Sequence, residues 1–79
     1  MTYVTYQGIR SRDPRLALRV VNERGVAFHV LAFSDDEEAS DVARRVSGSV
    51  HEDRDQAIRE ALTRAGPQDL ESRPRSGDL

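Results

Sequence analysis

The residues of this chain best suited to chemistry are its arginines. All twelve basic side chains in the 79 residues are arginine. Five of them fall in the first 34 residues, where only Asp13 and Glu23 are acidic: Arg10, Arg12, Arg15, Arg19 and Arg24. A guanidinium offers a planar fork of donors that matches phosphate or carboxylate oxygens. We therefore expect this half of the chain to contact an anionic partner. The alternative is that these arginines form a solvated surface without a partner, and that a GC-rich genome encodes arginine where other genomes encode lysine.

Acidic side chains dominate the remainder of the sequence. From residue 35 onward twelve acidic residues face seven arginines, and the whole chain has a net charge of −2. The densest group is a second candidate surface, suited to a basic protein partner: Asp35, Asp36, Glu37, Glu38 and Asp41. A smaller acidic group spans residues 52–55. The chain is thus polarised from one end to the other, which suggests two opposite kinds of partner.

The sequence offers little to a catalytic or metal site. Its histidines are His29, inside an apolar segment, and His51, which precedes Glu52 and Asp53. No glycine-rich phosphate loop and no serine elbow is present, and there is no cysteine. The cluster of His51, Glu52, Asp53 and Asp55 could hold a cation weakly, but carboxylates before a helix usually cap it. We predict no catalytic residue, no metal and no cofactor.

Three apolar segments read as strands: residues 3–10, 16–22 and 26–33. The second and third are separated by residues 22–25, whose Asn and Gly tolerate positive φ, so they are predicted to form an antiparallel hairpin. Asp13 and Pro14 mark a turn between the first and second. The expected sheet is a three-stranded meander.

Alternation along these strands indicates where the core lies. It places three side chains of the second strand on one face: Leu16, Leu18 and Val20. The third strand is apolar on both faces, with Phe28 and Val30 on one and Leu31 and Phe33 on the other. It is therefore predicted to be central. A dimer partner, a ligand or a helix could cover the second face of the sheet.

Two helices are expected after the strands, which makes the fold class α+β. Ser34 and Glu37 form a capping box for a helix over residues 35–46. A second helix begins near Asp53, with Gln56 as its reciprocal partner, and ends at residues 66–67; its apolar residues include Ile58 and Leu62. Residues 1–66 are thus predicted to form one domain, and the polar segment 67–79 to be disordered.

Two motifs resemble known DNA-binding families. Tyr6-Gln7-Gly8-Ile9-Arg10 and Phe33-Ser34-Asp35-Asp36-Glu37-Glu38-Ala39 resemble the plant ethylene-response-factor domain over residues 6–46. The arm-binding domains of tyrosine integrases similarly combine three strands with a helix. The resemblance implies a sheet lying in the major groove of DNA, which admits a β-ribbon. It also implies phosphate and base contacts by Arg10, Arg12 and Arg15, with Arg19 on the same outward face.

Residues 53–62 resemble the second helix of ribbon-helix-helix repressors and antitoxins, which would imply a dimer. The segment 26–33 would then be the ribbon, although His29 is the one polar side chain it could use to read bases. The overall interpretation is a small, non-enzymatic, cytoplasmic regulatory or accessory module that binds DNA through the arginine-bearing face of the sheet. The alternative is a protein-binding inhibitor or adaptor, of phage or antitoxin type, that uses its acidic helices. No segment is long and apolar enough for a membrane span.

Overall fold

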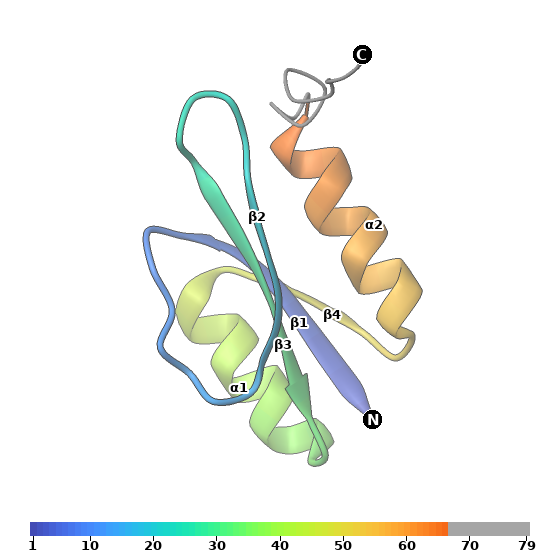
Figure 1. Ribbon diagram of the computed structural model, residues 1–79. Coiled ribbons are helices and arrows are strands. Elements are labelled where there is room, and N and C mark those ends of the chain that lie inside the picture. The colour runs from blue at the N-terminus through green and yellow to red at the C-terminus, as the bar shows by residue number, and fades with distance from the viewer. Residues whose placement is uncertain (67–79) are drawn as a thin grey trace.

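The chain forms an α+β domain around a four-stranded antiparallel sheet (Figure 1). The computed structural model describes residues 1–66. Its elements are β1 (Thr2–Gly8), β2 (Leu16–Val21), β3 (Ala27–Phe33), α1 (Asp36–Val46), β4 (Ser49–His51) and α2 (Arg54–Ala65). The α+β class and both helices are confirmed, whereas the prediction of three strands missed β4. The predicted disordered tail lies outside the described residues.

The strand order is β2-β3-β1-β4, so the predicted meander is wrong. β1 pairs with β3 along its whole length, from Thr2 opposite Phe33 to Gly8 opposite Ala27. These two strands bury side chains on both faces, and central positions remove the most apolar surface from water. β2 exposes every second residue and takes an edge. Residues 9–15 must therefore cross over β3 to join β1 to β2.

The β2–β3 hairpin predicted around Asn22 is confirmed. The Gly25 amide donates to the Asn22 carbonyl at 2.9 Å, and Asn22 Oδ1 accepts from the amides of Arg24 and Val26. Gly25 has a φ of 84°, a conformation that glycine adopts without steric penalty. Asn22 Nδ2 also donates to the Ala65 carbonyl at 3.1 Å. That bond ties the tip of the hairpin to the last turn of α2.

Each face of the sheet is covered by one helix (Figure 1). The α1 face has a core cluster of Val4, Leu31, Phe33, Ala39 and Ala43. The α2 face has a second cluster of Val20, Phe28, Val30, Ala57, Ala61 and Ala65. β3 is central and buried on both sides, as predicted. The sequence left open whether a dimer partner, a ligand or a helix covers the second face of the sheet. In the structure α2 covers it. Dimerisation stays a prediction.

The predicted core is confirmed at Val20, Phe28 and Val30 but wrong at Leu62. Leu62 is 44% exposed because α2 faces the sheet with its alanines, which recur every four residues and let the helix approach closely. Thr5 Oγ1 donates to the Ala57 carbonyl at 2.9 Å within this contact.

The shared face predicted for the second strand is confirmed for Leu18 and Val20 but wrong for Leu16. An irregularity in register falls between Leu16 and Leu18, so that Leu16 packs on the α1 side and Leu18 on the α2 side. Both leucines, like Ile58, are only half-buried. The break in alternation is what separates side chains that strict period-two spacing would place together.

The helix starts were predicted to within one residue. Asp35, and not Ser34, caps α1: its carboxylate accepts from the amides of Glu37 and Glu38. Asp53 caps α2 as predicted and accepts from the Asp55 amide. Neither helix among residues 1–66 has the length and apolar character to span a membrane.

Candidate nucleic-acid interface

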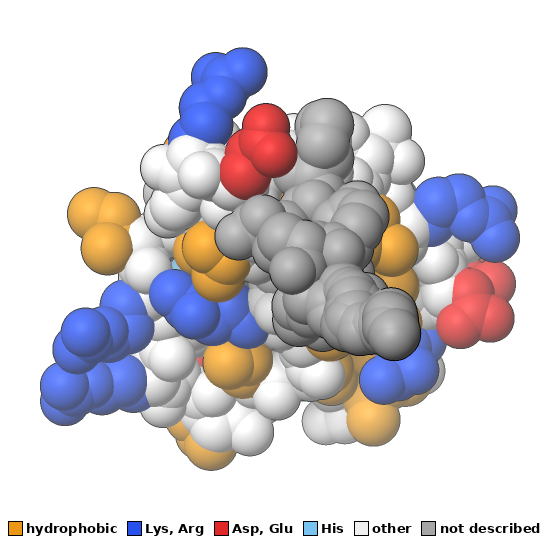
Figure 2. All heavy atoms as spheres, turned by 45° about the horizontal axis from the view of Figure 1, so that its top comes forward, with side chains coloured by type: hydrophobic (Ala, Val, Ile, Leu, Met, Phe, Trp, Pro, Cys, Tyr) orange, Lys and Arg blue, Asp and Glu red, His pale blue; other side chains and the backbone are white. Residues whose placement is uncertain are grey.

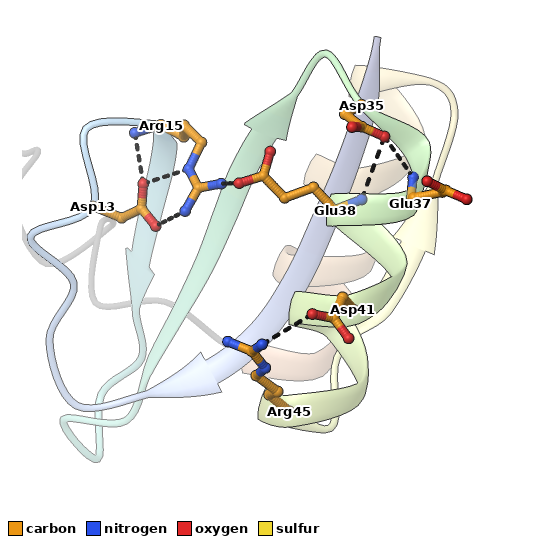
Figure 3. Close-up of polar contacts among 7 residues, drawn as sticks. All are labelled: Asp13, Arg15, Asp35, Glu37, Glu38, Asp41 and Arg45. Carbon is orange, nitrogen blue, oxygen red and sulfur yellow. Dashed lines mark hydrogen bonds and ion pairs between the residues drawn. The ribbon is translucent and has the colours of Figure 1, made fainter.

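Arg15, one of the predicted contact arginines, is held within the domain by Asp13 and Glu38, as Figure 3 shows, and by the Phe33 ring. Its guanidinium donates to both carboxylate oxygens of Asp13, at 2.8 and 2.7 Å, and to Glu38 at 2.6 Å. It also lies over the Phe33 ring, 4.4 Å from the centroid. These hydrogen bonds hold the pKa of Asp13 below its ordinary value. Arg15 thus joins the segment 9–15 to α1 and is largely occupied.

The other four predicted arginines are exposed: Arg10, Arg12, Arg19 and Arg24. Arg10 and Arg12 lie in the segment that crosses β3, and Arg24 lies in the hairpin turn. Arg19 stands on the edge strand opposite His29 and donates to the Ile9 carbonyl at 3.5 Å, which brings the start of the crossing segment to β2. None of the four forms an ion pair with another residue in the range 1–66. We call these four residues the arginine edge.

The predicted acidic surface on α1 is mostly engaged in bonds within the domain (Figure 3). Asp35 caps the helix, and Asp36 accepts a hydrogen bond from the Thr2 hydroxyl. Glu38 pairs with Arg15, while Asp41 pairs with Arg44 at 2.7 Å and Arg45 at 3.0 Å. Of the five predicted acidic contacts, Glu37 alone has a carboxylate without such a bond to residues 1–66.

The two helices run in the same direction, and this separates the charges of the domain (Figure 1). The first turns of α1 and α2 hold acidic residues, and their last turns hold Arg44, Arg45 and Arg64. Each sign suits the helix dipole at that end. Figure 2 looks toward the end with the hairpin tip and the last turn of α2, and it shows arginines spread widely with few acidic side chains among them.

A pocket of about 530 Å³ lies at this arginine-rich end. Four separate segments line it. They are residues 7–9 at the end of β1, residues 25–27 at the start of β3, Val46 and Ser47 at the end of α1, and Arg64 of α2. We call it the end pocket. The sequence prediction missed all of its lining residues. They are a mixture of polar, glycine and apolar positions from four separate stretches of the chain, so no local signal marks them as a site.

The histidines do not form a catalytic arrangement with the acidic residues. His29 is fully buried, its ring lies 5.0 Å from the Tyr6 ring, and neither nitrogen has a hydrogen-bond partner among the described residues. Burial and the nearby charge of Arg19 lower the pKa of His29. His51 lies in β4, and Asp53 is occupied as a helix cap. No group of three metal-ligating side chains suited to a metal ion occurs in residues 1–66.

Comparison of the chain with protein-family models, with curated proteins and with solved structures gives no match. The resemblances to the ethylene-response-factor, integrase-arm and ribbon-helix-helix domains stay predictions. What the site does is argued below from its own residues.

Proposed function

We propose that this domain is a small, non-enzymatic accessory or regulatory module that binds DNA through the arginine edge. One observation supports this most directly. Arg10, Arg12, Arg19 and Arg24 are exposed and form no ion pair within residues 1–66, whereas most acidic side chains of α1 are already bonded. Unpaired guanidiniums are free to take phosphate oxygens, and Arg is the side chain best shaped for that contact.

Helices on both faces of the sheet change how DNA would be contacted. A sheet covered on both sides cannot lie flat in the major groove, so we assign the contact to the segment 9–15, the edge strand β2 and the hairpin turn. Arg15 is left out of the contact set because Asp13 and Glu38 already hold it. The net charge of −2 does not oppose binding at this surface, because much of the acidic charge lies at the other end of the helices.

The number of arginines fixes the expected salt dependence. Four phosphate contacts predict that log affinity for duplex DNA falls with log salt concentration at a slope of about −3.6. Fluorescence anisotropy with a labelled random-sequence duplex, titrated at several salt concentrations, measures this slope. Replacing Arg12 and Arg24 with alanine removes two contacts, so the slope should shrink to about −1.8 and affinity should fall at every salt concentration.

A matched control removes the same charge elsewhere. Arg54 and Arg59 of α2 are also exposed and form no ion pair with residues 1–66. The double variant Arg54→Ala/Arg59→Ala should keep the parent slope. Equal losses in the two double variants would refute the arginine edge and leave only a general charge effect.

A second candidate function is protein binding through α1, the predicted inhibitor or adaptor role. The observation that favours it is an open acidic recess of about 720 Å³ along α1, lined by Asp35, Asp36, Glu37, Glu38, Ser40, Asp41 and Arg44. Glu37 has the carboxylate in this set that is free of bonds to residues 1–66. Glu37→Lys should therefore abolish capture of a basic protein partner while leaving the duplex-DNA slope no weaker than in the parent.

A further inference from the structure

The end pocket has the size and position of a ligand site that is separate from the arginine edge. Its volume of about 530 Å³ falls within the range of roughly 300–1,000 Å³ typical of small-molecule sites. Its walls come from segments that only the folded chain brings together. The strand pairing of Gly8 with Ala27 forms its sheet side, and the ends of α1 and α2 border it on either face.

The lining mixes apolar surface with a few polar groups. Ile9, Val26 and Val46 supply apolar side chains, and Ile9 is 93% exposed at the pocket's edge. Gln7 offers an amide and Ser47 a hydroxyl, each of which can both donate and accept. Gly25 has no side chain, and no atom of residues 1–66 beyond its chain neighbours lies within 4 Å of where a Cβ would stand, so a ligand can approach its backbone closely. A planar, partly apolar ligand with hydrogen-bonding edges fits this combination.

Arg64 adds a cation with a defined orientation. Its guanidinium lies over the Phe28 ring, 5.3 Å from the centroid, and Phe28 is buried in the sheet. Arg64 is exposed and has no ion-pair partner among residues 1–66. The guanidinium can therefore stack against a base or take phosphate oxygens.

We propose that the end pocket binds one unpaired nucleotide, that is, a nucleoside 5′-phosphate unit. The base packs against the apolar wall, with Gln7 and Ser47 at its edges, and the phosphate contacts Arg64. This inference rests on the proposed DNA binding, because Arg10 and Arg24 of the arginine edge directly adjoin the lining residues Ile9 and Gly25 in the chain. A duplex held by the arginine edge would thus present an unpaired strand end to the pocket. The same chemistry would accept a free nucleotide.

The test compares one labelled duplex with blunt ends and the same duplex with a three-nucleotide single-stranded overhang. Stacking and phosphate contact by one nucleotide should make the overhang duplex bind at least about fivefold more tightly. Arg64→Gln should reduce this preference below about twofold and leave blunt-duplex affinity nearly unchanged. Gln7→Glu keeps the shape of the side chain but replaces its amide donor at the edge of the base with a carboxylate, and it should do the same. Thermal melting verifies that each variant is folded.

Matched controls come from another recess, on α2, that contains Arg59 and Gln56. Arg59→Gln and Gln56→Glu make the same chemical changes outside the end pocket and should retain the overhang preference. Deoxyadenosine 5′-monophosphate, added as a competitor, should suppress the preference without displacing the blunt duplex. That result would assign the shared nucleotide chemistry to the pocket.

The outcomes separate this inference from the proposed function. Equal affinity for both duplexes, with the expected salt slope, overturns the nucleotide site and leaves DNA binding in place. A preference that survives both Arg64→Gln and Gln7→Glu also overturns the placement. If no DNA binds but deoxyadenosine 5′-monophosphate does so in an Arg64-dependent manner, the pocket's ligand class stands and the DNA function fails. Absence of both overturns both.

Discussion

Replacing the buried histidine should stabilise the domain and remove part of its pH sensitivity. His29 lies in the middle of β3, fully buried, with both ring nitrogens lacking a hydrogen-bond partner among residues 1–66. Tyr6 faces the ring from β1, Arg19 lies opposite it on β2, and a side chain at Gly8 would lie 3.1 Å from it. No carboxylate contributes to the lowered pKa of His29, so a proton on the ring would have no acceptor beside it. His29→Leu substitutes an apolar side chain of similar size.

The expected magnitude follows from the unpaired nitrogens and from the direction of the pKa shift. A buried polar group without a partner costs about 1–3 kcal/mol, so His29→Leu should raise the free energy of unfolding by about 1–2 kcal/mol near neutral pH. Because the pKa of His29 is lower in the folded state, the unfolded chain takes up the proton first as pH falls through about 6.5. Stability is then lost by at most about 1.4 kcal/mol per pH unit, or up to about 2 kcal/mol by roughly pH 5.

Urea unfolding at about pH 8 and about pH 5 measures both effects. The parent should lose stability between these values, and His29→Leu should lose distinctly less. His51→Leu is the control, since it removes the other histidine of the chain. Identical pH dependence in the parent and His29→Leu would refute the reasoning. So would a variant that is less stable than the parent at the higher pH, because that would mean the imidazole has a stabilising partner.

Five further substitutions test the packing, the α1 cap and the contacts of Arg15. Leu62→Ala should lower the free energy of unfolding by less than about 1 kcal/mol, because the side chain is 44% exposed. Ala61→Leu should lower it by about 1–3 kcal/mol, because the larger side chain overpacks the contact between α2 and the sheet. Urea unfolding measures both changes. Asp35→Ala should cost about 1 kcal/mol through loss of the α1 cap, and Ser34→Ala should change thermal stability little. Arg15→Ala should lower the free energy of unfolding through loss of its two ion pairs and of its cover over Phe33, again by urea unfolding. Part of the stability of the parent comes from the lowered pKa of Asp13. This contribution is present above the ordinary aspartate pKa of about 3.9 and is lost as pH falls below it. Measuring the free energy of unfolding of the parent and Arg15→Ala at a series of acidic pH values determines the contribution.

Local chemistry in the sequence was enough to predict several elements. Asn22 and Gly25 predict the hairpin because their side chains and φ preferences act within four residues. Asp53 predicts the start of α2 for the same reason, since a cap bonds to an amide of the first turn. The two apolar faces of β3 indicate a central strand wherever its neighbours lie. The sequence named the four residues of the arginine edge as candidates, but it grouped them with Arg15, which is paired within the fold.

Contacts between distant residues decided the rest. β1 pairs with β3, and both strands bury side chains on both faces; the turn residues at 13–14 do not reveal this long-range pairing. β4 is three residues long, too short to show a period, and exists because β1 offers it an open edge. Leu62 is exposed because the sheet accepts a close alanine surface, and Arg15 is occupied because the chain crossing β3 places it against Glu38. The end pocket depends wholly on tertiary structure: its walls come from four segments, and no one of them alone indicates a pocket.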